Sequence, residues 1–129
     1  MTPNAPLLRE FVVLVVDDDL DSLATAAYAI EALGCSVLRA TSRDEALAIL
    51  DSGAHVDLLF SDVVMPSGSG LELAHDVRQR RSSLPIVLAT GYATIVDAVA
   101  AAGAIPLIKP YSMDRLEAVL CEHLHVPRA

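Results

Sequence analysis

The chain has 129 residues, of which 53% are hydrophobic and 20% are charged, and its formal net charge is −8 at pH 7. A chain of this length and composition can bury a core as one domain, which excludes an intrinsically disordered protein. The negative charge argues against nucleic acid or an anionic membrane surface as a direct partner.

The first predicted strand, 11–16, is an apolar run rich in β-branched residues, and the carboxylates of Asp17, Asp18 and Asp19 follow it directly. Like charges about 4 Å apart repel by roughly 4 kcal/mol at an effective dielectric of about 20. A cation among the carboxylates would offset this repulsion. The triplet alone is equally consistent with a solvated turn in which Asp19 or Asp21 caps a helix.

The next elements alternate between helix and strand. An apolar stripe with helical spacing begins at Leu23 and ends at Gly34, a residue suited to a helix C-cap. A strand over 36–40 follows, and a second helix runs from about Ser42 to about Gly53, with acidic residues in its first turn.

The third predicted strand, 57–61, leads into Asp62, and the third helix starts after Gly70. That helix ends in Arg78, Arg80 and Arg81. Cations are favourable at a helix C-terminus, so these arginines require no functional explanation.

The last elements follow the same alternation. The fourth strand, 85–90, ends in Thr90, and the fourth helix, about 95–102, is short and rich in Ala and Val. The fifth strand, 104–108, precedes Lys109, and the fifth helix follows Ser112 as its N-cap.

Five strands that alternate with five helices predict an α/β fold, with a parallel sheet covered on both faces. Five strands are too few for an eight-stranded barrel, so we expect the flavodoxin-like (βα)5 architecture with strand order 2-1-3-4-5. The elements account for residues from about 9 to 124, so we expect one domain over 1–129 and no output domain.

Polar side chains follow the predicted strands at one edge of this sheet. Asp17 and Asp18 follow the first strand, Asp62 the third, Thr90 the fourth and Lys109 the fifth. Carboxylate oxygens suit Mg²⁺, whereas zinc would call for His or Cys. Together with a hydroxyl and an ammonium group they predict a phosphoryl-transfer site, in which a carboxylate can be the nucleophile.

The motifs at these positions are V-V-D-D-D at 15–19, D-V-V-M-P-S-G-S-G-L-E-L at 62–73, A-T-G-Y at 89–92 and K-P-Y at 109–111. In these motifs, over essentially the whole chain, the sequence resembles the receiver domain of two-component response regulators. The resemblance implies a signalling switch rather than an enzyme.

The resemblance also assigns roles to residues. Asp62 would be the phosphoacceptor, Thr90 and Lys109 would each bond a phosphoryl oxygen, and Mg²⁺ would be held by Asp17, Asp18, Asp62 and the main-chain carbonyl of Val64. It further implies a cis peptide bond between Lys109 and Pro110. Asp19 would be an outer acidic neighbour, and Asp21 a cap for the first helix.

The chain departs from the usual receiver pattern at Pro106, where many receivers have an aromatic residue that rotates on phosphorylation. Pro106 together with L-A-T-G-Y resembles the FAT-GUY subgroup, with Leu88 in place of its Phe. Tyr92 is either a substitute switch or a partly buried packing residue. We expect Tyr111 to pack in the core.

The resemblance predicts a single-domain response regulator that is phosphorylated from a phosphohistidine on a sensor histidine kinase or a histidine phosphotransfer protein. Its output partner would be another protein, and the receiver would be a monomer or a weak homodimer. The alternatives are a receiver from a hybrid histidine kinase and a haloacid-dehalogenase-type phosphohydrolase.

Two isolated cysteines, Cys35 and Cys121, have no metal-ligand spacing and read as free buried thiols in a reducing compartment. The N-terminus lacks the basic region and long apolar run of a signal peptide. We therefore expect a cytoplasmic protein.

Overall fold

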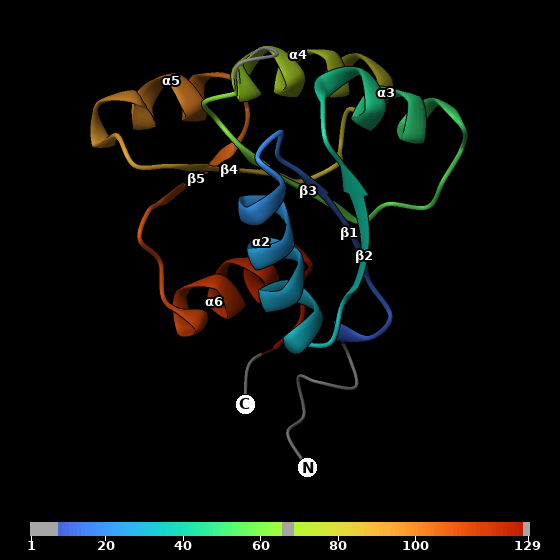
Figure 1. Cartoon of the computed structure of the whole chain (residues 1–129), viewed down its shortest axis with the longest axis vertical. Helices are drawn as coiled ribbons and strands as arrows, with labels where there is room; N and C mark the ends of the chain where they lie inside the picture. The colour runs from blue at the N-terminus through green and yellow to red at the C-terminus, as the bar shows by residue number, and fades with distance from the viewer. Residues whose placement is uncertain (1–7, 66–68, 128–129) are drawn as a thin grey trace.

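The computed structural model describes residues 8–65 and 69–127. Its centre is a five-stranded parallel sheet in the order β2-β1-β3-β4-β5, which confirms the predicted order (Figure 1). The strands are β1 (Val12–Val16), β2 (Ser36–Ala40), β3 (Leu58–Asp62), β4 (Ile86–Thr90) and β5 (Ile105–Ile108).

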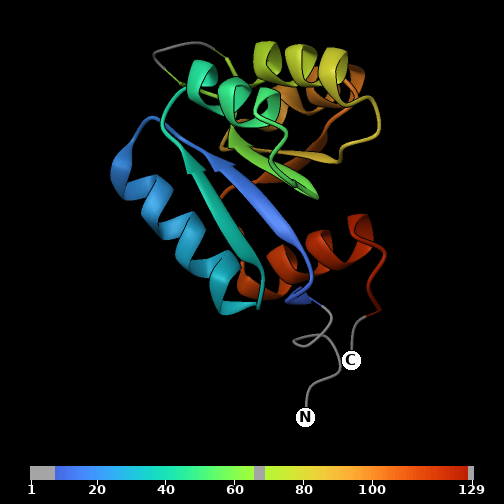
Figure 2. The ribbon, with the colours of Figure 1, turned by 90° about the vertical axis from the view of Figure 1, so that its right-hand side faces the viewer.

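Helices cover both faces of the sheet, as Figures 1 and 2 show. The helices on one face are α2 (Leu20–Ala32) and α6 (Met113–His123). The helices on the other face are α3 (Arg43–Asp51), α4 (Gly70–Arg80) and α5 (Val96–Ala101), the last preceded by the 3₁₀ turn η1 (Ala93–Ile95). None of the described helices is long and apolar enough to span a bilayer.

The strand side chains alternate between two cores because successive residues of a strand point to opposite faces. In β1, Val13 and Val15 pack with α2 and α6, whereas Leu14 and Val16 pack with α3 and α4. Both faces are buried, which explains why the strand sequences are continuous apolar runs.

The helix starts follow the capping rules, with one correction. Ser42 and Ser112 cap α3 and α6 as predicted. The cap of α2 is Asp19, so the expectation of Asp21 is wrong: the Asp19 carboxylate accepts the N–H of Ser22 at 3.2 Å and its hydroxyl at 2.5 Å. Asp21 lies inside the first turn instead, where its charge favours the helix dipole.

The arginines at the end of α4 bond to main-chain carbonyls from other parts of the chain. Arg78 donates to the carbonyls of Leu84 at 2.6 Å and Gly103 at 2.7 Å. Arg81 donates to the carbonyls of Leu50 and Ala54, at the end of α3. These side chains therefore link three helices, beyond complementing the helix dipole.

Candidate functional site

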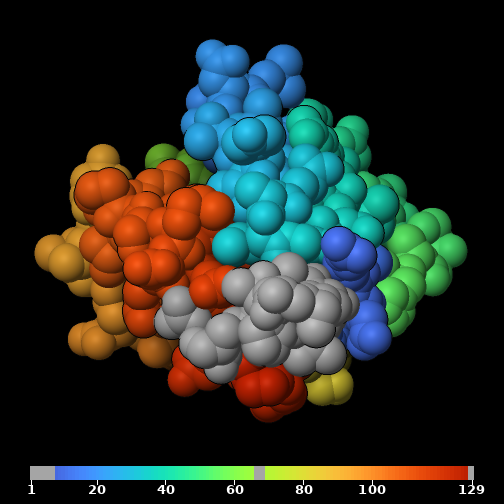
Figure 3. All heavy atoms as spheres, turned by 90° about the horizontal axis from the view of Figure 1, so that it is seen from below, coloured from blue at the N-terminus to red at the C-terminus, as the bar shows by residue number. Residues whose placement is uncertain are grey.

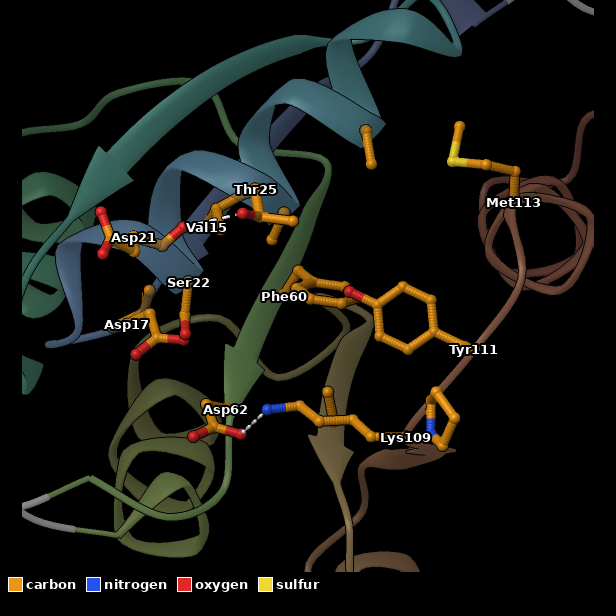
Figure 4. A pocket seen from close by; sticks show the side chains of 15 residues that line it. Val15, Asp17, Asp21, Ser22, Thr25, Phe60, Asp62, Lys109, Tyr111 and Met113 are labelled. Atoms are coloured by element: carbon orange, nitrogen blue, oxygen red, sulfur yellow. Dashed lines mark hydrogen bonds and ion pairs between the residues drawn. The ribbon is translucent and has the colours of Figure 1, made fainter.

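The carboxyl ends of β1, β3, β4 and β5 bring the predicted polar residues to one edge of the sheet. Asp62 is the last residue of β3 and pairs in register with Ala89 of β4. Asp17 directly follows β1, Thr90 ends β4 and Lys109 directly follows β5. The side chains of Asp17, Asp62 and Lys109 line one pocket (Figure 4).

An ion pair joins the ends of β3 and β5. The Lys109 ammonium donates to a carboxylate oxygen of Asp62 at 2.7 Å, and both side chains are partly exposed. A charge-assisted hydrogen bond of this length is among the stronger polar contacts of a protein. The pair therefore holds the Asp62 carboxylate toward the Lys109 side of the pocket.

Asp17 is the most buried acid of the site, with 7% of its surface exposed. Burial raises the pKa of its carboxyl group, and the negative charges of Asp62 and Asp18 raise it further. A hydrogen bond from the main-chain N–H of Asp19, at 3.0 Å, and the charge of Lys109 act in the opposite direction. The rise therefore comes first from burial, and the neighbouring carboxylates add to it.

Thr90 is 2% exposed and connects the site to the next loop. Its hydroxyl oxygen accepts the main-chain N–H of Tyr92 at 3.0 Å. Its main-chain carbonyl accepts the N–H of Lys109 at 2.7 Å. A change in the orientation of the Thr90 side chain would therefore alter this hydrogen bond to Tyr92, the N-cap of η1.

The start of α4 rests directly against the backbone that carries Asp62. The N–H of Gly70 donates to the carbonyl of Val63 at 2.7 Å. A Cβ atom on Gly70 would lie 2.5 Å from the main-chain oxygen of Asp62, so only glycine fits there. From the sequence, Gly70 is predicted only to precede a helix. Its position in S-G-S-G, after a strand that ends in a polar residue, is the signal that two backbone segments approach closely there.

Two residues that flank the site point into solvent. The exposed fraction is 59% for Val64 and 63% for Tyr92, so the alternative that Tyr92 is a partly buried packing residue is wrong. Tyr111 packs edge-on against Phe60, with ring centroids 6.1 Å apart, in agreement with its predicted core position. The peptide bond between Lys109 and Pro110 is cis, as expected.

Pro106 lies in β5, at an edge of the sheet. The main-chain N–H of Lys109 points to β4. Successive main-chain nitrogens of a strand point to opposite sides, so the nitrogen of Pro106, three residues earlier, faces the open edge of the sheet. A proline there removes no hydrogen bond from the sheet and leaves the open edge one donor fewer for another strand to pair with.

The carboxylates do not surround a common point as they stand. Across residues 8–65 and 69–127, no group of three or more His, Cys, Asp or Glu side chains is placed to hold a metal ion. The Asp62 carboxylate is directed to Lys109, and an oxygen of Asp17 accepts the N–H of Asp19. Asp18 is partly buried beside them. Residues 66–68 of the motif after β3 lie outside the described residues.

Comparison with known proteins agrees with this arrangement. The family model of the response regulator receiver domain matches residues 13–120. A receiver domain from Clostridium thermocellum superposes with a TM-score of 0.82 at 25% identity, over 89% of this chain and 94% of that one. The response regulator TrrA of Thermotoga maritima, solved in complex with Mg²⁺-BeF, superposes with a TM-score of 0.80 at 26% identity, over 88% and 98%.

A curated relative is the alginate biosynthesis transcriptional regulatory protein AlgB of Pseudomonas aeruginosa, which is 32% identical over 117 residues. The match covers 88% of this chain and 26% of AlgB. The chain therefore spans about a quarter of the length of that relative.

Proposed function

The chain belongs to the response regulator receiver domain family of two-component signalling, and from that premise we propose that it is a stand-alone regulator phosphorylated on Asp62. The observation that supports Asp62 as the phosphoacceptor is its pairing with Lys109 at 2.7 Å, at the same carboxyl edge of the sheet as Asp17 and Thr90. Receiver domains are signalling switches, so the product is a modified protein rather than a released metabolite.

The proposed step transfers a phosphoryl group between proteins. An Asp62 carboxylate oxygen attacks the phosphorus of a phosphohistidine on a sensor kinase or a histidine phosphotransfer protein. The phosphorus–nitrogen bond breaks, and the imidazole leaves and takes up a proton. The product is an acyl phosphate on Asp62.

Mg²⁺ would be held by Asp17, Asp18, Asp62 and the main-chain carbonyl of Val64. The donor set fits, because all four groups offer the hard oxygen atoms that Mg²⁺ prefers, and a cation would offset the repulsion of the buried Asp17 by Asp62 and Asp18. The likeness to TrrA in its Mg²⁺-BeF complex also supports this assignment. Bound Mg²⁺ would supply charge neutralisation for the incoming phosphoryl group.

Lys109 and Thr90 would hold the phosphoryl group once it is attached. Lys109 already contacts Asp62 and needs only to exchange a carboxylate oxygen for a phosphoryl oxygen. The Thr90 hydroxyl would donate to another oxygen. Each charge-assisted hydrogen bond contributes roughly 1.5–3 kcal/mol. Inverting a two-state population from 1:99 needs about 5.5 kcal/mol, so two or three such contacts have the required scale.

The segment 91–102 would be the part of the chain that responds. Its link to the site is the bond from the Tyr92 N–H to the Thr90 hydroxyl, since Pro106 offers no aromatic side chain to rotate. Recruiting Thr90 to the phosphoryl group changes the start of η1. Partner binding would follow from this change, and the partner would be another protein.

We propose that the protein is cytoplasmic, because Cys35 and Cys121 are buried and do not form a disulfide. Western blotting of cell extract with an antibody against the chain tests whether it acts by itself. A band of 13.6 kDa supports a stand-alone regulator, whereas a much larger band indicates a receiver within a hybrid kinase or another longer protein.

Intact mass spectrometry tests the phosphoacceptor. With acetyl phosphate and Mg²⁺ we expect one phosphoryl adduct on the chain and on Asp114→Asn, an exposed carboxylate on α6 that serves as the control. The adduct should be absent from Asp62→Asn and from samples with excess chelator. An adduct that persists in Asp62→Asn, or that maps to Asp17 as in a haloacid-dehalogenase-type phosphohydrolase, would contradict the proposal.

A further inference from the structure

A cavity of about 730 Å³ extends from the phosphoacceptor site between α2 and the connection from β5 to α6. Figure 3 shows the atoms of α2 (blue to cyan) beside the orange atoms that lead into α6 on one face of the molecule. The volume is in the range of about 300–1,000 Å³ found for small-molecule sites. The phosphoryl-transfer chemistry uses only one end of it.

The cavity exists because α2 turns small side chains toward it. Leu23 and Ile30 of α2 are buried in the core, whereas Ala26 and Ala29 line the cavity. On the α6 side, Met113 is 46% exposed, and the buried residues of α6 begin at Leu116. The first turn of α6 therefore contributes no buried side chain that would fill the cavity.

The deep wall of the cavity is apolar and partly aromatic. Phe60 and Tyr111 lie next to each other, and Met113 at the start of α6 also lines the cavity (Figure 4). Aromatic rings and a methionine sulfur make favourable contacts with another ring. This wall suits a flat apolar body.

The rim of the cavity is negative. Three carboxylates line it, from Asp17, Asp21 and Asp62, against the single ammonium of Lys109. That ammonium forms its ion pair with Asp62, so the rim holds two further carboxylates, Asp17 and Asp21, and no second basic residue. An anionic ligand is repelled by this rim, and a cationic head is attracted to it.

We propose that the cavity binds small aromatic amines. The ring lies against Phe60, Tyr111 and Met113, and the ammonium group lies between Asp17 and Asp21. Such a ligand places a positive charge beside the phosphoacceptor and occupies the mouth of its pocket. It would therefore regulate the site by occupying Asp17, a residue that the proposed function assigns to Mg²⁺.

Titration of the free chain in buffer without Mg²⁺ tests the binding, and its outcome does not depend on phosphorylation of Asp62. The probe is 2-phenylethylamine, followed by amide chemical shifts. We expect saturable shifts at residues that line the cavity, and at least tenfold weaker binding of phenylacetate, which reverses the charge, and of ethylamine, which lacks the ring. Equal affinity for all three compounds, or shifts confined to other surfaces, would overturn the proposal.

Two substitutions in α2 locate the site. Ala29→Leu fills the cavity and should weaken binding at least tenfold, whereas Ala24→Leu, at an exposed position of the same helix, should leave it within twofold. Asp21→Asn removes one rim charge and should weaken binding about threefold, which provides a second test if Ala29→Leu does not fold. Unchanged affinity in the folded cavity variants would overturn the proposal.

Discussion

Helices α3 and α4 and the segment η1–α5 cover the same face of the sheet, but different contacts hold them there. Side chains link α3 to α4: Arg43 pairs with Asp76, Arg80 pairs with Asp51, and Arg81 donates to carbonyls at the end of α3. Ser69 and Glu72 also form a capping box at the start of α4. Side-chain contacts therefore hold α3 and α4 to each other, and a cap stabilises the start of α4.

The η1–α5 segment has few such contacts. Neither η1 nor α5 has a side-chain cap, α5 has six residues, and Val99 is its one buried residue. A side chain from outside the segment binds just after the C-terminal end of α5, where Arg78 donates to the carbonyl of Gly103. Local stability varies across a protein with the number of such contacts. Thr90 is thus hydrogen-bonded, through the Tyr92 N–H, to the less restrained of the two regions.

A glycine in each region gives the largest expected contrast. Gly70→Ala should lower the free energy of unfolding by about 3 kcal/mol, because its Cβ would overlap the main-chain oxygen of Asp62 at the start of α4. Gly91→Ala is the matched control, since a Cβ there meets no atom within 4 Å, and it should change stability by less than about 1 kcal/mol. Urea denaturation measures the free energy of unfolding of both variants. Equal losses of stability would contradict the difference between the two regions.

The arginine that links the two regions gives the next largest effect. Arg78→Ala should destabilise the chain by about 2 kcal/mol, because the carbonyls of Leu84 and Gly103 lose a charged donor. Arg80→Ala removes a more exposed ion pair with Asp51 and should cost less than about 1 kcal/mol. Amide exchange in α5 should rise only in the Arg78 variant. A larger loss for the Arg80 variant would contradict this order.

On the opposite face of the sheet, under α2 and α6, a buried thiol should make the stability of the fold depend on pH. Burial raises the pKa of the Cys35 thiol from 9.0 to about 11. Above pH 9 the unfolded chain releases this proton while the folded chain keeps it, so stability falls as pH rises from about 9 to about 11, by about 2 kcal/mol. Urea titrations at a series of pH values should show a smaller decrease for Cys35→Ala than for the parent chain. Parallel pH profiles would exclude Cys35 as the cause.

The smallest expected effect is on the lifetime of the acyl phosphate. Val64 follows Asp62 by two positions, and its side chain has no polar group that could orient an attacking water. Val64→Asn should speed dephosphorylation about threefold, which corresponds to roughly 0.7 kcal/mol in the barrier. Met65→Leu, a buried neighbour of similar volume, is the control. The decay of the phosphorylated mass measures the rate, and an unchanged rate would count against a role for position 64.

Much of the fold could be predicted from the sequence because its signals are local. The apolar runs locate the strands, and Ser42 and Ser112 mark two helix starts. Because parallel strands end at one edge, the same runs place Asp17, Asp62 and Lys109 together. The sequence does not determine the N-cap of α2, since Asp19 and Asp21 are both good capping residues. The backbone conformation decides between them, because the N-cap residue lies outside the helical conformation.

The remaining features depend on contacts between distant residues. Arg81 reaches the carbonyl of Leu50, 31 positions away, and Lys109 reaches Asp62, 47 positions away. No local pattern marks an arginine as a link rather than a favourable helix-end charge. The cavity likewise depends on which face of α2 carries Ala26 and Ala29 once the helix has packed.

We infer that phosphorylation acts on the segment 91–102 and leaves α3 and α4 unchanged. Amide hydrogen exchange with and without Mg²⁺ and beryllofluoride, a phosphoryl mimic, tests this inference. We expect at least tenfold greater protection across 91–102, and less than twofold change in Arg43–Asp51 and Gly70–Arg80. Unchanged protection across 91–102, or an equal change in all three segments, would contradict it.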